Sequence, residues 1–329
     1  MLFCTLMTLS FIYLFIGVAL ILYGANWLTD GASSIAKRMH IPDLIIGLTV
    51  VAFGTSAPEL SVSLISSLHG SGGMSVGNVL GSNIFNILAI LGITALIVPL
   101  PVTKPMQRFD IPIAIVGALL LILVLVDLDF DGAPSILTRS EGIILLCFAY
   151  LFIRYTIYMG KKGSSRNEEV ETQVKTMSTP KSALWIILGL AGLVAGGQLF
   201  VTGASDIAKT LGVSDTIIGL TIVAWGTSLP ELATSIVAAI KRNTDIALGN
   251  VIGSNIFNIF IVLGLSATIS PMHNLAFTWT DLLLQLGATL LLLIFGRYIQ
   301  QGVIARWQGA IMLTIFIAYN GLLISQALQ

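Results

Sequence analysis

Two stretches of the chain decide its fold: GLTVVAFGTSAPE, from Gly47 to Glu59, and GNVLGSNIFN, from Gly77 to Asn86. Both recur 172 residues later, as GLTIVAWGTSLPE ending at Glu231 and GNVIGSNIFN ending at Asn258. About half of positions 31–99 are identical to their partners, without a gap. Chance does not produce a match of this length, so the chain contains an internal repeat.

The composition places this repeat in a membrane. Of the 329 residues, 56% are hydrophobic and 10% are charged, whereas a soluble domain carries roughly 25% charged residues. The hydrophobic residues lie in runs of about 20, the length that crosses a bilayer core. The formal net charge is zero, so it favours no nucleic-acid partner. The sequence therefore predicts an all-α membrane protein and excludes soluble, disordered and small secreted classes.

Polar breaks between the apolar runs predict ten transmembrane helices. They lie near residues 5–36, 41–68, 74–99, 109–127, 140–160, 182–208, 213–240, 245–270, 278–296 and 303–326. Five is an odd number, so the second five helices must enter the membrane from the opposite side. We therefore expect two inverted five-helix repeats, at 1–160 and 182–329, joined by a linker at 161–181. Inverted repeats are typical of secondary transporters, whose sites lie near the midplane between the repeats.

The basic residues predict the orientation. With the 161–181 linker in the cytoplasm, 14 Lys and Arg residues are cytoplasmic, and only Arg139 and Lys209 fall outside. Cytoplasmic loops are enriched in Lys and Arg. The count therefore predicts a multi-pass protein of the cell membrane with both termini extracytoplasmic.

Two acidic residues lie deep inside predicted helices. Glu59 and Glu231 each follow about 18 largely apolar residues, and no Lys or Arg lies at comparable depth. A carboxylate at that depth is costly unless paired, and it indicates a functional site. Without a protein cation, its partner must be a proton or a bound cation.

Neutral oxygen atoms surround both carboxylates in the sequence. Pro58 and Pro230 lack an amide hydrogen, so each leaves the carbonyl four residues earlier without its helical partner. Two sets of hydroxyl and amide side chains lie at helical spacing nearby: Thr55, Ser56, Ser82 and Asn86, with Thr227, Ser228, Ser254 and Asn258 as their repeat partners. Hard oxygen ligands without Cys or His favour sodium, calcium or magnesium over zinc or copper.

These motifs resemble the two alpha-repeats of the sodium/calcium exchangers, in the cation/calcium exchanger superfamily. The resemblance rests on GTSAPE and GTSLPE, each followed by GSNIFN, and it covers nearly all of the membrane chain. It implies a ten-helix fold that exchanges sodium for calcium by alternating access, with the helices at 5–36 and 182–208 sliding across the rest. It implies no cofactor, only the two transported ions.

The resemblance also implies a role for each residue of the motifs. Calcium would be held by Glu59 and Glu231 and by the backbone carbonyls of Thr55 and Thr227. Sodium would use Ser56, Ser228, Ser82 and Ser254 with the carbonyls of Ala52 and Ala224, while Asn86 and Asn258 would line the middle of the cavity.

Two features of the chain qualify the resemblance. Some relatives carry Asp where this chain has Asn258, and Asp there is associated with potassium dependence or protonation. The short 161–181 linker has no room for the calcium-sensing domains of animal exchangers, so we expect no allosteric regulation by calcium.

The main alternative is proton-driven exchange of calcium or another divalent ion on the same carboxylates. A scaffold without transport is a second one. An intramembrane enzyme is disfavoured, because the chain has no HExxH motif and no GxSxG motif. Cys4 and Cys147 lie in apolar runs, and we expect them to be buried thiols.

Overall fold

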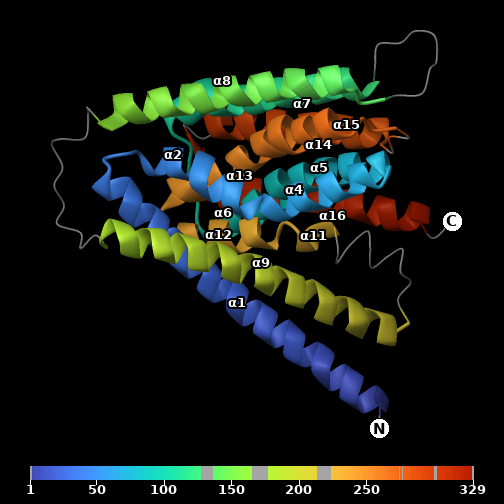
Figure 1. The fold of residues 1–329 in the computed structure, drawn as a ribbon. Coiled ribbons are helices and arrows are strands. Elements are labelled where there is room, and N and C mark those ends of the chain that lie inside the picture. The colour runs from blue at the N-terminus through green and yellow to red at the C-terminus, as the bar shows by residue number, and fades with distance from the viewer. Residues whose placement is uncertain are drawn as a thin grey trace.

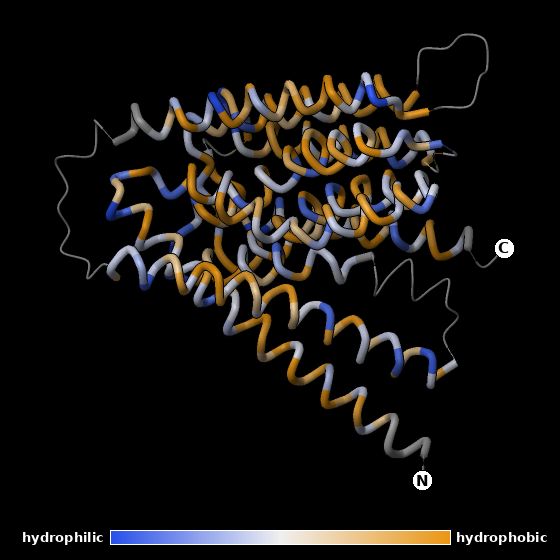
Figure 2. The backbone as a smooth tube through the Cα atoms, viewed as in Figure 1, coloured by the Kyte–Doolittle hydropathy of each residue, from blue (hydrophilic) through white to orange (hydrophobic). Residues whose placement is uncertain are grey.

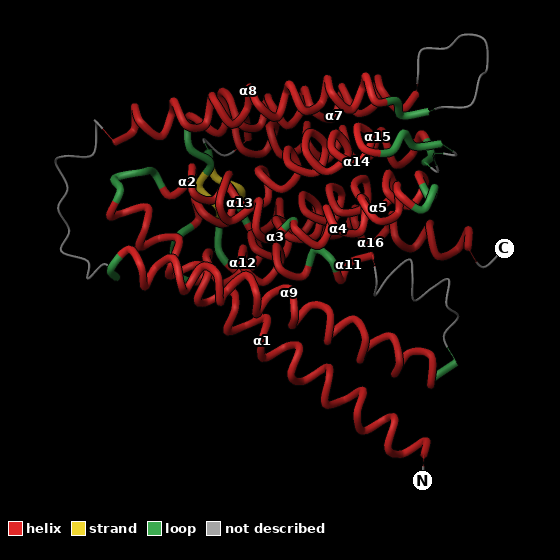
Figure 3. Tube along the Cα trace, in the orientation of Figure 1, coloured by secondary structure: helices red, strands yellow, loops and turns green. Residues whose placement is uncertain are grey.

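The structure is a computed structural model. It describes residues 2–126, 136–164, 177–212, 224–273, 275, 277–299 and 302–327. Within these ranges the protein is a bundle of long helices (Figures 1 and 3). Eight helices are long and apolar enough to cross a membrane, and the bent pair at 43–68 makes a ninth span. The prediction of an all-α protein with several membrane spans is thereby confirmed.

The first half of the chain contains a long helix, a broken helix and three further spans. Its elements are α1 (Leu2–Arg38), α2 (Asp43–Ile46), η1 (Gly47–Val51), α3 (Ala52–Thr55), α4 (Ala57–Leu68), α5 (Gly72–Ile84), η2 (Phe85–Ile90), α6 (Leu91–Ile97), β1 (Leu100–Pro101), η3 (Met106–Asp110), α7 (Ile111–Val126) and α8 (Arg139–Ser164). The η elements are π-helical turns that continue the neighbouring α-helices.

The second half repeats this order. Its elements are α9 (Thr179–Thr210), α11 (Ala224–Gly226), α12 (Leu229–Ile240), α13 (Thr244–Phe257), η5 (Asn258–Leu263), α14 (Gly264–Ile269), α15 (Trp279–Ile294), η6 (Phe295–Ile299), β2 (Val303–Ile304) and α16 (Arg306–Ala327). Residues 213–223 of the predicted 213–240 helix and 165–176 of the linker lie outside the described residues. The short strands β1 and β2 pair antiparallel and join the two halves.

Hydrophobic residues make up much of the outer helices of the bundle (Figure 2), as expected of helices that face lipid. Large hydrophobic side chains such as Phe15, Ile187 and Ile317 are more than 60% exposed. In contrast, every residue of α13 from Ile246 to Phe257 is buried. Cys147 is exposed on α8, so the expectation of a buried thiol there was wrong, and the side chain of Cys4 lies outside the described residues.

Glycines bring α1 and α9 into backbone contact. The two helices lie side by side and run in opposite directions (Figure 1). Glycines recur every seven residues on both, and the structure places them against the partner backbone: Gly17, Gly24 and Gly31 on α1, and Gly189, Gly196 and Gly203 on α9. Because small residues let membrane helices approach closely, the two backbones come into contact at these glycines.

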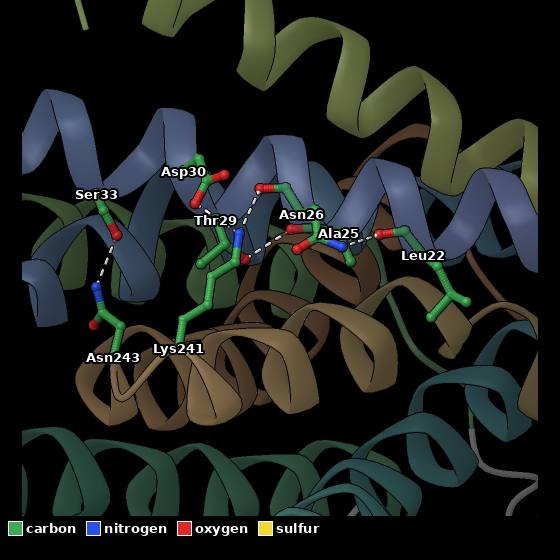
Figure 4. A network of polar contacts seen from close by, with 8 residues as sticks. All are labelled: Leu22, Ala25, Asn26, Thr29, Asp30, Ser33, Lys241 and Asn243. Carbon is green, nitrogen blue, oxygen red and sulfur yellow. Dashed lines mark hydrogen bonds and ion pairs between the residues drawn. The ribbon is translucent and has the colours of Figure 1, made fainter. Parts of the chain in front are cut away.

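Polar side chains fix the end of α1 to the helices of the second half (Figure 4). Lys241, after α12, forms an ion pair with Asp30 on α1 at 2.6 Å. Asn243 Nδ2 donates to Ser33 Oγ and to Asp43 Oδ2, both at 2.8 Å. Asn243 Oδ1 also accepts from the amide of Ile246 and so caps α13.

Candidate cation-binding site

Each half of the chain breaks a helix next to its buried carboxylate. Ser56 and Ser228 have non-helical backbone angles, and a proline occupies the first turn of the helix that follows. The axis bends by 46° between α3 and α4. Glu59 and Glu231 therefore lie in the first turns of α4 and α12, where free amides and the helix dipole favour negative charge. Both side chains are fully buried.

Each carboxylate accepts a hydrogen bond from a serine of the opposite repeat. Ser56 Oγ donates to Glu231 Oε1 at 2.8 Å, and Ser228 Oγ donates to Glu59 Oε1 at 2.9 Å. Ser56 lies three residues before Glu59, and this helical spacing predicted that its hydroxyl would lie near the carboxylate of Glu59. Its bond goes to the other repeat instead, because the two breaks face each other across the interface.

The second motif adds a hydroxyl from within each repeat. Ser82 Oγ lies 3.5 Å from Glu59 Oε1, and Ser254 Oγ lies 3.4 Å from Glu231 Oε1. Each Oε1 atom is therefore approached by one serine of its own repeat and one of the other. Serine hydroxyls are the hydrogen-bond donors that the described contacts give to the two Oε1 atoms, and no Lys or Arg among the described residues forms an ion pair with either carboxylate.

Among the carboxylate and amide groups of this region, four buried oxygen atoms have no hydrogen-bond donor in the described contacts. They are Oε2 of Glu59, Oε2 of Glu231, Oδ1 of Asn86 and Oδ1 of Asn258. The amide nitrogens of both asparagines are already used, donating to Oδ1 of Asn255 and of Asn83 at 3.0 and 3.1 Å. Buried polar atoms are nearly always paired. Four unpaired acceptors at the interface of two repeats are therefore a candidate site for a cation.

These oxygen atoms are the kind of ligands that a hard cation prefers. No group of three or more His, Cys, Asp or Glu that could hold a metal occurs among the described residues. The site instead combines two carboxylates with neutral hydroxyl and amide oxygens, which suit Na⁺ and Ca²⁺.

The remaining predicted residues lie at the two helix breaks. Thr55 is buried, and its hydroxyl donates to Asn250 Oδ1 at 3.0 Å, whereas Thr227 Oγ1 is buried without a partner. The carbonyl of Ala52 accepts the amide of Ser56 at 3.0 Å. Ala224 begins α11, and its side chain lies outside the described residues.

Several polar residues, most of them buried, were missed from the sequence. Four asparagines of the GNxxGSNxxN motifs contact the site residues: the half-buried Asn78 and the buried Asn83, Asn250 and Asn255. Their position in the repeated motif was the available signal. Asp110 is 2% exposed at the start of α7, where its place at the edge of a predicted span gave no sign of burial.

A buried all-oxygen site between two repeats of a membrane bundle defines a secondary cation transporter. A family model for the sodium/calcium exchanger protein matches residues 9–159 and 181–325. The chain belongs to the sodium/calcium exchanger family, as the sequence motifs predicted. It is thus a membrane cation/calcium antiporter and not an enzyme.

Individual relatives agree with this assignment. The sodium/calcium exchanger MaX1 of Methanosarcina acetivorans is 33% identical over 95% of this chain and 98% of its own length. The inner membrane protein YrbG of Escherichia coli is 40% identical over 80% of this chain and 81% of its length. Among solved structures, the sodium-calcium exchanger NCX_Mj soaked with zero Na⁺ and Ca²⁺ is 35% identical, with a TM-score of 0.80 over 96% of this chain and 99% of that chain.

Proposed function

We propose that this protein exchanges sodium for calcium across the cell membrane by alternating access. The observation that carries the proposal is the set of four unpaired, buried acceptor oxygens, one from each of two carboxylates and one from each of two asparagine amides. Two carboxylates balance one divalent ion, and the same oxygens can hold monovalent ions instead. Competing ions thus neutralise one buried pair, and carrying the empty charged site across the membrane is costly.

In this proposal the charged carboxylates bind calcium and the neutral hydroxyls bind sodium. Calcium takes Glu59 and Glu231 with the backbone carbonyls of Thr55 and Thr227. Sodium takes the four serine hydroxyls and two backbone carbonyls, from Ser56, Ser228, Ser82, Ser254, Ala52 and Ala224. Asn86 and Asn258, whose Oδ1 atoms accept no hydrogen bond in the described contacts, line the middle of the ion-binding cavity in this proposal. The contacts of the serines with both carboxylates support this division.

A cavity beside the two helix breaks is the proposed route of the ions. It measures about 560 Å³ and lies between α4, α9 and the second helix break, with Pro58, Thr227 and Pro230 among its lining residues. Its wall on α9 runs from Val194 to Thr202, toward the end of the molecule where α1 begins (Figure 1).

The membrane topology that supports this mechanism has ten spans in two inverted repeats, at 1–160 and 182–329. The end of α8 and the start of α9 lie at one end of the bundle, and the start of α1 and the end of α16 lie at the other (Figure 1). The antiparallel contact of α1 with α9 is what two inverted copies of one helix produce. The 161–181 linker is cytoplasmic in this topology.

The topology predicts that both termini are extracytoplasmic. A reporter that is active only in the cytoplasm, fused after Gln329, is expected to be inactive, while the same reporter inserted at Ser164 is expected to be active. The basic count of 14 to 2 is the reason. Activity of the fusion after Gln329 contradicts the topology and the ten-span count.

The experiment that tests the function separates sodium from proton coupling. Purified protein in liposomes is loaded with sodium and diluted into sodium-free medium that contains labelled calcium. Uptake is expected to follow the sodium gradient and to be unaffected by potassium or pH gradients. Uptake that follows an imposed pH gradient and ignores sodium assigns the same carboxylates to proton exchange instead.

Substituting the serines of the second motif should affect sodium more than calcium. Ser82→Ala and Ser254→Ala each remove a neutral oxygen, while calcium draws most of its binding energy from the carboxylates. Each change is expected to cost sodium about 1–3 kcal/mol, the cost of a lost buried polar partner. Half-saturating concentrations of both ions measure this. An equal loss of calcium affinity contradicts the division of ligands.

A further inference from the structure

Asn250 connects both repeats beside the site. It is fully buried on α13. Its Nδ2 atom donates to the carbonyl of Glu231 at 3.3 Å and to Ser235 Oγ at 3.0 Å, while its Oδ1 accepts from Thr55 Oγ1 at 3.0 Å. Every hydrogen-bonding group of this side chain except one acceptor lone pair is used. One amide therefore ties the backbone of one carboxylate residue to a residue of the opposite repeat.

Asn78 makes the equivalent contacts in the first repeat. Its Nδ2 donates to the carbonyl of Glu59 at 3.2 Å and to Ser63 Oγ at 2.9 Å. The two serines also contact the helix that carries the asparagine. Ser63 Oγ lies 3.5 Å from the carbonyl oxygen of Ser75, and Ser235 Oγ lies 3.4 Å from that of Ala247. In each repeat an asparagine and a serine therefore join two helices, α4 to α5 in the first and α12 to α13 in the second.

Asn78 and Asn250 bond the backbone carbonyls of Glu59 and Glu231 and leave the carboxylate oxygens available to an ion. Neither asparagine bonds a carboxylate oxygen of Glu59 or Glu231 in the described contacts, so neither competes with an ion. Each holds its Glu carbonyl in the first turn after a helix break, where a proline follows the broken segment and one helical hydrogen bond is missing. Holding that turn fixes the direction in which the carboxylate leaves the helix.

We propose that Asn78 and Asn250 are positioning residues for the calcium site, and that Asn250 also sets Thr55 of the opposite repeat. A ligand set held by outer hydrogen bonds stays ordered when the ion leaves, which lowers the cost of reorganising it on binding. Asn250 fixes Thr55, whose carbonyl is a proposed calcium ligand, relative to Glu231. This inference rests on the proposed function.

Equilibrium binding of labelled calcium to purified protein tests the role. Asn250→Ala and Asn78→Ala are each expected to raise the half-saturating calcium concentration at least about tenfold. The matched control is Asn320→Ala, because Asn320 is a buried asparagine of α16 whose amide bonds only its own helix, at Phe316, in the described contacts. It is expected to bind calcium as the unaltered protein does.

Variants of Thr55 distinguish positioning of the calcium site by Asn250 from a general effect of Asn250 on stability. Thr55→Val removes the hydroxyl at nearly constant volume and is expected to weaken calcium binding several-fold, whereas Thr55→Ser is expected to restore it. The double variant Asn250→Ala with Thr55→Val should bind no worse than Asn250→Ala alone, because both lose the same bond. If Asn250→Ala does not fold, Thr55→Val and Asn78→Ala decide by the same criterion.

The outcomes separate this inference from the function on which it rests. If the unaltered protein binds no calcium, the proposed function is wrong. If the unaltered protein binds calcium and Asn78→Ala, Asn250→Ala and Thr55→Val all bind it equally well, the function stands and the positioning role is refuted.

Discussion

Glu59→Gln and Glu231→Gln are each expected to abolish calcium exchange and leave a folded protein. Glutamine keeps the shape of the side chain and an oxygen that can accept from Ser228 or Ser56, so the crossed hydrogen bonds survive. The negative charge is lost, and a divalent ion then lies beside one carboxylate in a buried site. Losing one partner of a buried charge pair costs about 3–5 kcal/mol, which lowers calcium affinity at least about 100-fold.

Labelled calcium uptake into liposomes measures this effect, with folding checked by size-exclusion chromatography. The matched control is Glu141→Gln, because Glu141 accepts hydrogen bonds from Thr138 at the start of α8, away from the site. That variant should transport normally. Near-normal calcium transport by either site variant removes the central role of the two carboxylates.

Gly24→Leu and Gly196→Leu are expected to destabilise the protein strongly. A Cβ atom at Gly24 would lie 2.8 Å from the carbonyl oxygen of Gly189, and one at Gly196 would lie 2.8 Å from that of Gly17. These neighbours are backbone atoms, which cannot rotate away, so α1 and α9 must separate. Overpacking of this kind costs about 3 kcal/mol at the upper end of its usual range.

Thermal melting of the purified variants measures the loss. Gly321→Leu is the matched control, since a Cβ atom at Gly321 on α16 meets no other atom within 4 Å. It should melt like the unaltered protein. If Gly24→Leu melts with it, the backbone contact of α1 with α9 contributes little to stability.

The sequence predicted ten apolar spans, and the described residues contain eight, or nine with the bent pair at 43–68. The predicted span at 213–240 lies partly outside the described residues. The broken helix at 43–68 was predictable as one span because its hydrophobic run continues through the break, and the repeat at an offset of 172 residues predicted which residues would correspond. Fold and candidate carboxylates were thus both predictable from pattern and burial cost.

The partners of the site residues were not predictable in the same way. Spacing along one helix relates Ser56 to Glu59, but the bond to Glu231 depends on how the two halves dock. The same holds for Thr55 and Asn250, which are 195 residues apart. Spacing within one helix carries no information on such contacts, because any exposed face of a helix could meet the other half.

The glycines of α1 and α9 are a different case, since their signal was present. Gly17, Gly24 and Gly31 are seven residues apart, and their partners 172 residues later are Gly189, Gly196 and Gly203. A regular spacing of small residues in an apolar run predicts close helix packing. This spacing of glycines was not used to predict the packing of α1 against α9, although it was present in the sequence.

The most direct test of the site is the position of the ion itself. A crystal of this protein soaked with Ca²⁺ or Sr²⁺ should show one strong anomalous peak between Glu59 and Glu231, with a carboxylate oxygen of each at about 2.3–2.6 Å for calcium. The peak should weaken as sodium is added, because the two ions share the oxygens. A protein that transports calcium but shows no peak there, or one ligated by neither carboxylate, contradicts the account.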